Sequence, residues 1–242
     1  MPLVSSRPAP AVLQLLLDLP ATRNALTGEL VSALQDAVDT AACAVPGVRA
    51  IVLGSSTAGA FCSGVSLAID DAGRRALSDQ LYRLYASMLE CPVPVVAAVS
   101  GPAVGGGAQL ALAADVCVMS PQAFVRFAGP GHGLAVGAWA LPGAVGRGRA
   151  LEMMLSQRDI SGDEAVRTGL AQQLDDAPLE AAVALAVSVS SLDRDAVTRA
   201  KRLVVAGERL HERLAGERAG NSAFTGAVRG IARLGSGTSD AG

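Results

Sequence analysis

Aromatic side chains and lysine are nearly missing from this chain of 242 residues. Phe, Trp and Tyr make up only 3% of it, whereas hydrophobic residues make up 50%, so the core has to be built from Ala, Val and Leu. The basic residues are almost all Arg, with Lys201 as the single lysine, and the formal net charge is −2. Because nucleic acid needs a basic face on its partner, we expect no nucleic-acid partner.

Cysteine is also scarce, and its spacing indicates neither a metal site nor a disulfide framework. None of the four cysteines forms a CxxC pair, and no histidine lies near enough in sequence to complete a ligand set. They are Cys43, Cys62, Cys91 and Cys117. We expect reduced, buried thiols in a cytoplasmic protein without a bound metal. The first residues also lack the charged and apolar segments of a secretory signal.

The uncharged run 91–114 is long enough to cross a bilayer. Three prolines and a triple glycine within it oppose a continuous helix, so we expect no membrane span. The β-branched segment 93–99 instead predicts a buried strand, and the Ala- and Leu-rich segment after Gly105–Gly107 predicts a helix. The glycines then lie at a strand-to-helix turn, where main-chain amides without intrahelical partners suit an anion or a polarised carbonyl oxygen.

Strand and helix patterns alternate over the first 177 residues, which predicts an α/β core. Strands are expected at 11–19, 49–53, 93–99 and 116–119, with helices after Thr27, over 77–89, after Gly107, over 149–155 and after Ser161. Segment 68–76 is polar enough for an exposed loop, and 121–148 has little regular period. From Pro178 the composition becomes helical, so we place a helical C-terminal region at 178–234 and a disordered tail at 235–242.

Several short segments occur in a recognisable order along the chain. They are Arg23–Leu26, Val45–Leu53, Ala60–Leu67, Gly101–Gln109, and Leu151–Ser156 followed by Ala165–Leu170. Together they resemble the enoyl-CoA hydratase/isomerase (crotonase) superfamily, in register from about residue 11 to residue 175. A triple glycine alone is weak evidence, but the ordered set is specific.

The resemblance implies an α/β fold built as a spiral of ββα units, with a helical C-terminal region that forms trimers or hexamers (dimers of trimers). It implies an acyl-CoA as the ligand or substrate, in fatty acid or lipid metabolism, with no further cofactor. The thioester carbonyl is expected between two main-chain amides, which fall on Val65 and Gly106. Backbone donors of this kind stabilise an enolate or related oxyanion.

This chain departs from the family where hydratases carry two glutamates. The first position falls on Gln109, and the second falls at about Gly129. Water addition to a double bond needs a base for the water and an acid for the α-carbon, and an amide has no proton to exchange near neutral pH. The first hypothesis is therefore an acyl-CoA-binding protein with little or no hydratase activity.

The second hypothesis is an enzyme, an isomerase, hydrolase, decarboxylase or hydratase of an acyl-CoA, that uses a non-standard acid/base. Histidine is a common general acid/base, and His132 lies in the segment of the second glutamate position, while Asp70 follows the first turn, so these two are the candidates. A polar loop histidine and a solvated loop aspartate are the alternative interpretations. Residues that the resemblance places near CoA or the acyl chain are Arg23, Ala25, Ala60, Gly64, Ser66, Leu67, Ala68, Gly105 and Trp139.

Overall fold

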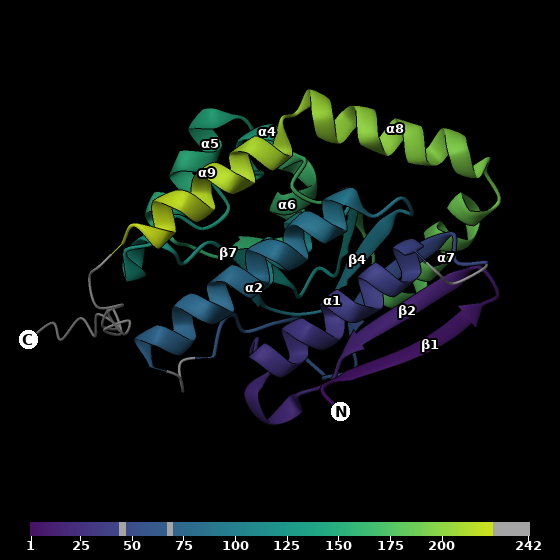
Figure 1. Ribbon diagram of the computed structural model, residues 1–242, viewed down its shortest axis with the longest axis horizontal. Helices are drawn as coiled ribbons and strands as arrows, with labels where there is room; N and C mark the ends of the chain where they lie inside the picture. The colour runs from purple at the N-terminus through teal and green to yellow at the C-terminus, as the bar shows by residue number, and fades with distance from the viewer. Residues whose placement is uncertain (44–46, 67–69, 225–242) are drawn as a thin grey trace, which may run out of the picture.

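The computed structural model describes residues 1–43, 47–66 and 70–224 (Figure 1). The predictions for Leu67, Ala68 and the tail 235–242 lie outside these ranges. The strands are β1 (Leu3–Ala9), β2 (Val12–Leu17), β3 (Ala50–Ser55), β4 (Val95–Val99), β5 (Ala103–Val104), β6 (Val116–Met119), β7 (Phe124–Arg126), β8 (Ile160–Ser161) and β9 (Gln173–Leu174). The helices are α1 (Gly28–Cys43), α2 (Asp71–Glu90), α3 (Gly106–Leu112), α4 (Leu141–Val145), α5 (Arg147–Ser156), α6 (Gly162–Thr168), α7 (Pro178–Ser190), α8 (Arg194–Gly207) and α9 (Leu210–Ser222), with 3-10 turns η1 (Pro20–Thr22) and η2 (Pro130–His132).

The main sheet has the strand order β1-β2-β3-β4-β6-β9, in which β1 and β2 are antiparallel and the remaining neighbours are parallel. Successive side chains of a strand point to opposite faces. Ile51 and Leu53 of β3 join the core that also contains α1 and α2, whereas Ala50 and Val52 pack with α7. Both faces are therefore covered, which explains why the central strands are continuous apolar runs. The predicted α/β class is confirmed.

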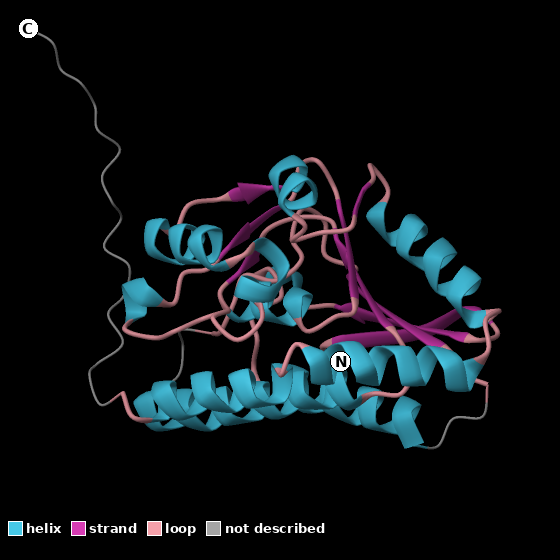
Figure 2. Ribbon diagram, turned by 90° about the horizontal axis from the view of Figure 1, so that it is seen from above, coloured by secondary structure: helices cyan, strands magenta, loops and turns pink. Residues whose placement is uncertain are grey.

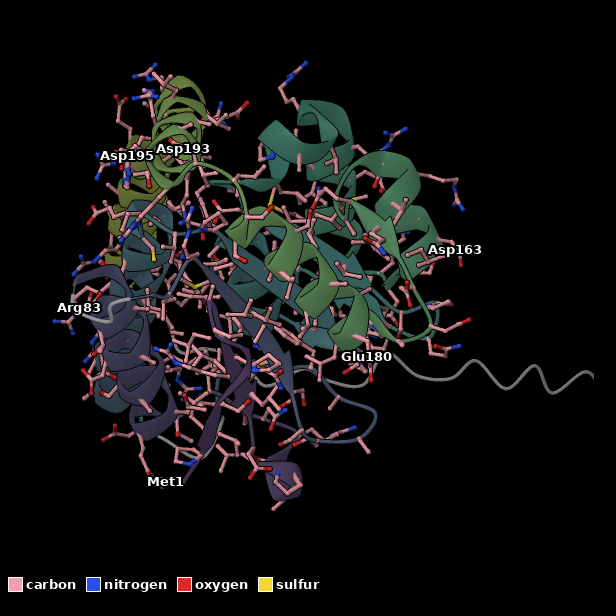
Figure 3. The ribbon with its side chains drawn as sticks, turned by 90° about the vertical axis from the view of Figure 1, so that its right-hand side faces the viewer. Met1, Arg83, Asp163, Glu180, Asp193 and Asp195 are labelled. Carbon is pink, nitrogen blue, oxygen red and sulfur yellow. The ribbon has the colours of Figure 1, made fainter. Side chains whose placement is uncertain are left out.

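The layers are visible in two views. Figure 2 shows the strands between a layer of long helices and a helix on the opposite side. Figure 3 looks onto α7 as it crosses the sheet, with Glu180 near its beginning. Ala182 and Ala186 of α7 are fully buried, because small side chains let the helix lie close to the strands. This helix begins at the expected boundary near residue 177, but it covers the sheet formed by the preceding residues.

A smaller sheet of β5, β7 and β8 lies beside the main one. β5 follows the end of β4 after a few residues and pairs in parallel with β7. The amide of Gly105 then donates to Arg126 O of β7 at 2.9 Å. The small sheet therefore fixes the beginning of the glycine turn from which α3 starts.

Two of the predicted helix starts, after Thr27 and after Ser161, are capped by side-chain oxygens. The amide of Leu30 donates to Thr27 Oγ1 at 3.2 Å at the start of α1. The amide of Glu164 donates to Ser161 Oγ at 3.3 Å at the start of α6, which ends on Gly169 in the left-handed region. Such side-chain acceptors satisfy amides that have no partner inside the helix.

Three sequence predictions need correction. Strand β1 was not anticipated, because its polar, mostly exposed residues show no apolar alternation and gain their order by pairing with β2. The expected loop 68–76 is shorter, since α2 begins at Asp71 behind the capping carboxylate of Asp70. The segment 121–148, expected to lack regular structure, contains β7 and α4.

The helical residues after α7 are tied to the core through the single lysine. Lys201 of α8 is buried, and its Nζ donates to Met88 O at 2.8 Å and to Asp115 Oδ2 at 2.7 Å. The same carboxylate oxygen accepts from the amide of Val95 at 2.8 Å. A buried ammonium is tolerated here because its protons have acceptors. Among the helices in the described ranges, none has both the length and the apolar character needed to cross a membrane.

Candidate functional site

Main-chain hydrogen bonds hold the turn 60–65 against the turn 101–106. The amide of Cys62 donates to Pro102 O at 3.0 Å, and the amide of Val104 donates to Cys62 O at 3.0 Å. Since only backbone atoms take part, these bonds need no side-chain donor or acceptor. The structure thus brings together two segments that lie about 40 residues apart in the sequence.

Glycine is required where these turns approach each other. A Cβ atom on Gly107 would lie 2.5 Å from Cys62 O and 2.8 Å from Cys62 Sγ. Gly64 has a φ of 98°, and a Cβ atom there would lie 2.8 Å from Val104 O. A larger residue at either position would push the turns apart or strain the backbone.

The main-chain amides of Val65 and Gly106 have no hydrogen-bond acceptor among the described residues. Leu26 forms a parallel β-bridge with Val65, in which Leu26 N donates to Gly64 O at 2.7 Å and Ser66 N donates to Leu26 O at 3.1 Å. In such a bridge the amide of Val65 itself points away from Leu26. Gly106 is the first residue of α3 and has no acceptor within that helix. Within the described ranges neither amide donates a hydrogen bond. A Cβ atom on Gly106 would lie 3.3 Å from Val65 Cγ2, so the two residues are neighbours.

Asn24 is a fully buried clamp behind the first turn. Its Oδ1 accepts from Leu19 N at 2.8 Å and from Thr57 Oγ1 at 2.9 Å. Its Nδ2 donates to Ser55 Oγ at 2.8 Å and to Phe61 O at 2.9 Å. One amide side chain therefore ties the end of β3 and the following loop to the start of the turn. Asn24 adopts a φ of 58°, a conformation that asparagine tolerates better than most residues.

Apart from Trp139, the described residues that were predicted near CoA lie at or beside these two turns. Arg23 is exposed, and its carbonyl accepts from Ser63 N at 3.0 Å. Ala25 and Ala60 are buried beneath the turn surface. Gly64 and Ser66 flank Val65, and Gly105 precedes Gly106. Their contact with CoA stays a prediction.

Gln109 is engaged by Trp139. The amide side chain is only 5% exposed, and its Oε1 accepts from Trp139 Nε1 at 2.7 Å. Trp139 is fully buried and stacks on Tyr85 at 6.4 Å between ring centroids. The Tyr85 hydroxyl donates to Gly106 O at 2.9 Å. The residue at the first glutamate position is thus linked to the glycine turn through two aromatic rings.

Gly129, near which the resemblance places the second glutamate, has no room for a side chain. A Cβ atom there would lie 2.5 Å from Val136 Cγ2 and 2.6 Å from Leu134 O. Real Cβ contacts are longer than this, so any substitution would displace the segment around 134–136. A carboxylate at residue 129 would therefore require this segment to move.

The two candidate acid/base residues lie in different settings. Asp70 caps α2, because its Oδ1 accepts from Gly73 N at 2.7 Å. His132 is half-buried in η2, close in sequence to Gly129. Cys62, which flanks the first turn, is no nucleophile here, since burial raises the pKa of its thiol to about 12.

Sequence reasoning missed Glu217, which α9 brings to the back of the site. Its carboxylate is 7% exposed. Oε1 accepts from the Tyr82 hydroxyl at 2.9 Å and from Gly137 N at 3.3 Å, while Oε2 accepts from Trp139 N at 3.0 Å. Burial raises the pKa of this carboxyl above its usual range. Nothing local in the sequence of α9 distinguishes Glu217 from the exposed Glu212.

Comparison with known proteins agrees with this arrangement. The family model described as "Enoyl-CoA hydratase/isomerase" matches residues 8–225. A protein of Mycobacterium tuberculosis named "Probable enoyl-CoA hydratase echA6" is 39% identical over 200 residues, which cover 81% of this chain and 79% of that protein.

Solved structures are similar over almost the whole chain. An enoyl-CoA hydratase/isomerase from Mycobacterium paratuberculosis has a TM-score of 0.83 at 27% identity and covers 91% of this chain and 92% of its own. A structure described as a monofunctional enoyl CoA isomerase from M. smegmatis has a TM-score of 0.74 at 29% identity, over 86% of this chain and 94% of its own.

Proposed function

This chain belongs to the enoyl-CoA hydratase/isomerase (crotonase) family and has its fold, and we propose that it binds an acyl-CoA by the thioester carbonyl with little or no hydration of it. The open, neighbouring amides of Val65 and Gly106 support a site for that carbonyl oxygen. Each such donor contributes roughly 2.7 to 4 kcal/mol where an oxyanion develops. For a carbonyl that does not react, the two amides orient the ligand and polarise it.

The observation that carries this proposal is the hydrogen bond from Trp139 Nε1 to Gln109 Oε1. Hydration needs one group to take a proton from water and another to deliver a proton to the α-carbon. A glutamine amide does neither, and here its oxygen accepts a hydrogen bond from the indole. Gly129 supplies no second group and cannot be replaced by glutamate without moving Val136.

The alternative function is catalysis on an acyl-CoA with a single acid/base. Isomerisation of a double bond moves one proton from one carbon to another, so one group that accepts and returns it is sufficient. The solved relative from M. smegmatis is described as a monofunctional enoyl CoA isomerase, so this reaction is represented among the similar proteins. His132 is the better candidate, because the carboxylate of Asp70 is used as a helix cap.

One experiment separates the two functions. Short-chain and long-chain enoyl-CoAs are titrated into the protein in a calorimeter, and the same mixtures are analysed for hydrated, isomerised and hydrolysed products. We expect saturable binding of acyl-CoA with product formation at the buffer rate. Turnover well above buffer that is lost in His132→Ala or Asp70→Ala would overturn the binding proposal in favour of the enzyme. No saturable binding of any acyl-CoA would refute both.

We also propose that the protein assembles as a trimer or a dimer of trimers. Large apolar side chains on two helices are exposed, with Leu155 of α5 at 69% and Leu203 of α8 at 68%. Leu151 and Val204 extend these two faces. Such surfaces are typical of contacts between subunits. Light scattering that gives the mass of one chain at micromolar concentration would contradict this.

We also propose that the protein is located in the cytoplasm. The free, buried thiols of Cys62, Cys91 and Cys117 fit a reducing compartment.

A further inference from the structure

The C-terminal helix α9 delivers a buried anion to the far side of the Gln109–Trp139 pair. Glu217 accepts hydrogen bonds from the Tyr82 hydroxyl and from the amides of Gly137 and Trp139. The Tyr82 oxygen in turn accepts from Asn221 Nδ2 at 2.7 Å. The hydroxyl donor belongs to α2, and the two amide donors belong to the segment before α4. Three parts of the chain far apart in sequence therefore converge on one side chain.

The partners of Glu217 identify the charge state that the geometry fits. Two of its hydrogen bonds come from main-chain amides, which can only donate, and the third comes from the Tyr82 hydroxyl, so a carboxylate satisfies all three. No arginine, lysine or histidine forms a salt bridge with Glu217 in the described part of the chain. The buried charge is therefore held by dipoles and by the Tyr82 hydroxyl alone, an arrangement that depends on exact donor positions.

Trp139 connects Glu217 to the candidate site. Glu217 holds the main chain of Trp139, and the indole of the same residue donates to Gln109. Tyr85 stacks on Trp139 and donates to Gly106 O, while the ring of Tyr82 packs edge-on against Tyr85 at 6.1 Å. A shift of the tryptophan would therefore move both Gln109 and the ring that holds the peptide of Gly106.

We propose that Glu217 is a positioning residue, which fixes Trp139 so that its indole engages Gln109 and closes the site beside the thioester. The role in ligand binding rests on the proposed function, whereas the role in setting Trp139 does not. Glu217 touches neither ligand nor reacting atoms in this scheme. It acts through the main chain of Trp139, so its loss should weaken binding of the acyl end of the ligand rather than of the CoA end.

Trp139 is the only tryptophan of the chain, so its fluorescence reports this arrangement directly. The test variant is Glu217→Gln, which keeps the shape of the side chain and removes the charge. The matched control is Glu212→Gln on the same helix, where the glutamate is exposed and pairs with Arg209. Tyr82→Phe removes one donor and provides a second, milder variant if Glu217→Gln folds poorly.

In ligand-free protein, we expect Glu217→Gln to shift the Trp139 emission to longer wavelength and to increase its quenching by acrylamide. Tyr82→Phe should change both in the same direction to a smaller extent, and Glu212→Gln should match the wild type. Emission and quenching that stay at wild-type values in both Glu217→Gln and Tyr82→Phe would overturn the proposal. Because no ligand is present, this result does not depend on whether acyl-CoA binds.

With acyl-CoA, we expect Glu217→Gln to weaken binding roughly tenfold, as for loss of a charged hydrogen bond, while free CoA binds as to the wild type. Trp139→Phe should weaken acyl-CoA binding similarly, and the double variant should be little worse than either single one. Effects of the two substitutions that add in full would contradict action through Trp139. If the wild type binds no acyl-CoA at all, the proposed function fails, and the fluorescence result still decides the positioning role.

Discussion

Asn24→Ala should cost about 4 kcal/mol of the free energy of unfolding, which is a large part of the stability of a typical domain. Two of the four partners of Asn24 are main-chain groups, Leu19 N and Phe61 O, and alanine leaves both without the amide that satisfied them. At about 1.5 kcal/mol for each stranded group, this loss is roughly 3 kcal/mol. The hydroxyls of Ser55 and Thr57 lose less, because Ser55 Oγ also donates to Thr57 O. Alanine at a positive φ adds about 1 kcal/mol of strain.

Urea unfolding followed by circular dichroism measures this cost, and two further variants separate its parts. Asn24→Gly relieves the strain and should be about 1 kcal/mol less destabilising than Asn24→Ala. Thr57→Val removes a single hydrogen bond to Asn24 and should cost about 1 kcal/mol. A loss below 1 kcal/mol for Asn24→Ala, with an unchanged urea dependence, would refute the reasoning. Acyl-CoA affinity should fall with Asn24→Ala, because the turn that carries Val65 loses its clamp.

Three more predictions concern buried polar groups. Gln109→Glu supplies one of two required carboxylates, so it should raise any trace hydration by no more than about 100-fold in a product assay. Lys201→Met leaves Met88 O without its donor and the partly exposed Asp115 without its ammonium, so it should cost about 1 to 3 kcal/mol in urea unfolding, part of which Asp115→Asn in the same chain should restore. Burial raises the folded-state pKa of Glu217, so its contribution to stability is complete below its usual pKa of 4.5 and is lost as the pH rises through the raised value. The stability of the wild type relative to Glu217→Gln should therefore decline over that interval and then level off. Thermal melts at a series of fixed pH values measure this difference.

The parts of the fold that the sequence predicts are those with a local cause. The run 95–99 is apolar on both sides because it lies in the middle of a covered sheet, and Thr27 and Ser161 cap helices within three residues. The glycine turn was also predictable, since Gly105–Gly107 stand between a strand pattern and a helix pattern. In each case the residues that reveal the structure are neighbours in the sequence.

The parts that escaped prediction have causes elsewhere in the chain. The residues of β1 are polar and exposed, so only the pairing with β2 makes them a strand. Glu217 belongs to a polar helix, and its burial depends on Tyr82 and on the segment before α4, which lies about 80 residues earlier. The steric exclusion at Gly129 arises from Val136 folding back over it. Periodicity and motif spacing in the sequence do not predict such tertiary contacts.

The neutral side chain of Gln109 and the charge of Glu217 are physically coupled. Both residues bond to Trp139, one to its indole and the other to its main-chain amide. A glutamate at position 109 would place a second buried carboxylate on the same tryptophan, and like charges at short range raise each other's pKa and oppose ionisation. Gln109 lets Glu217 remain the single anion of the network. We therefore predict that a base introduced at position 109 works better in the double variant Gln109→Glu with Glu217→Gln than in Gln109→Glu alone.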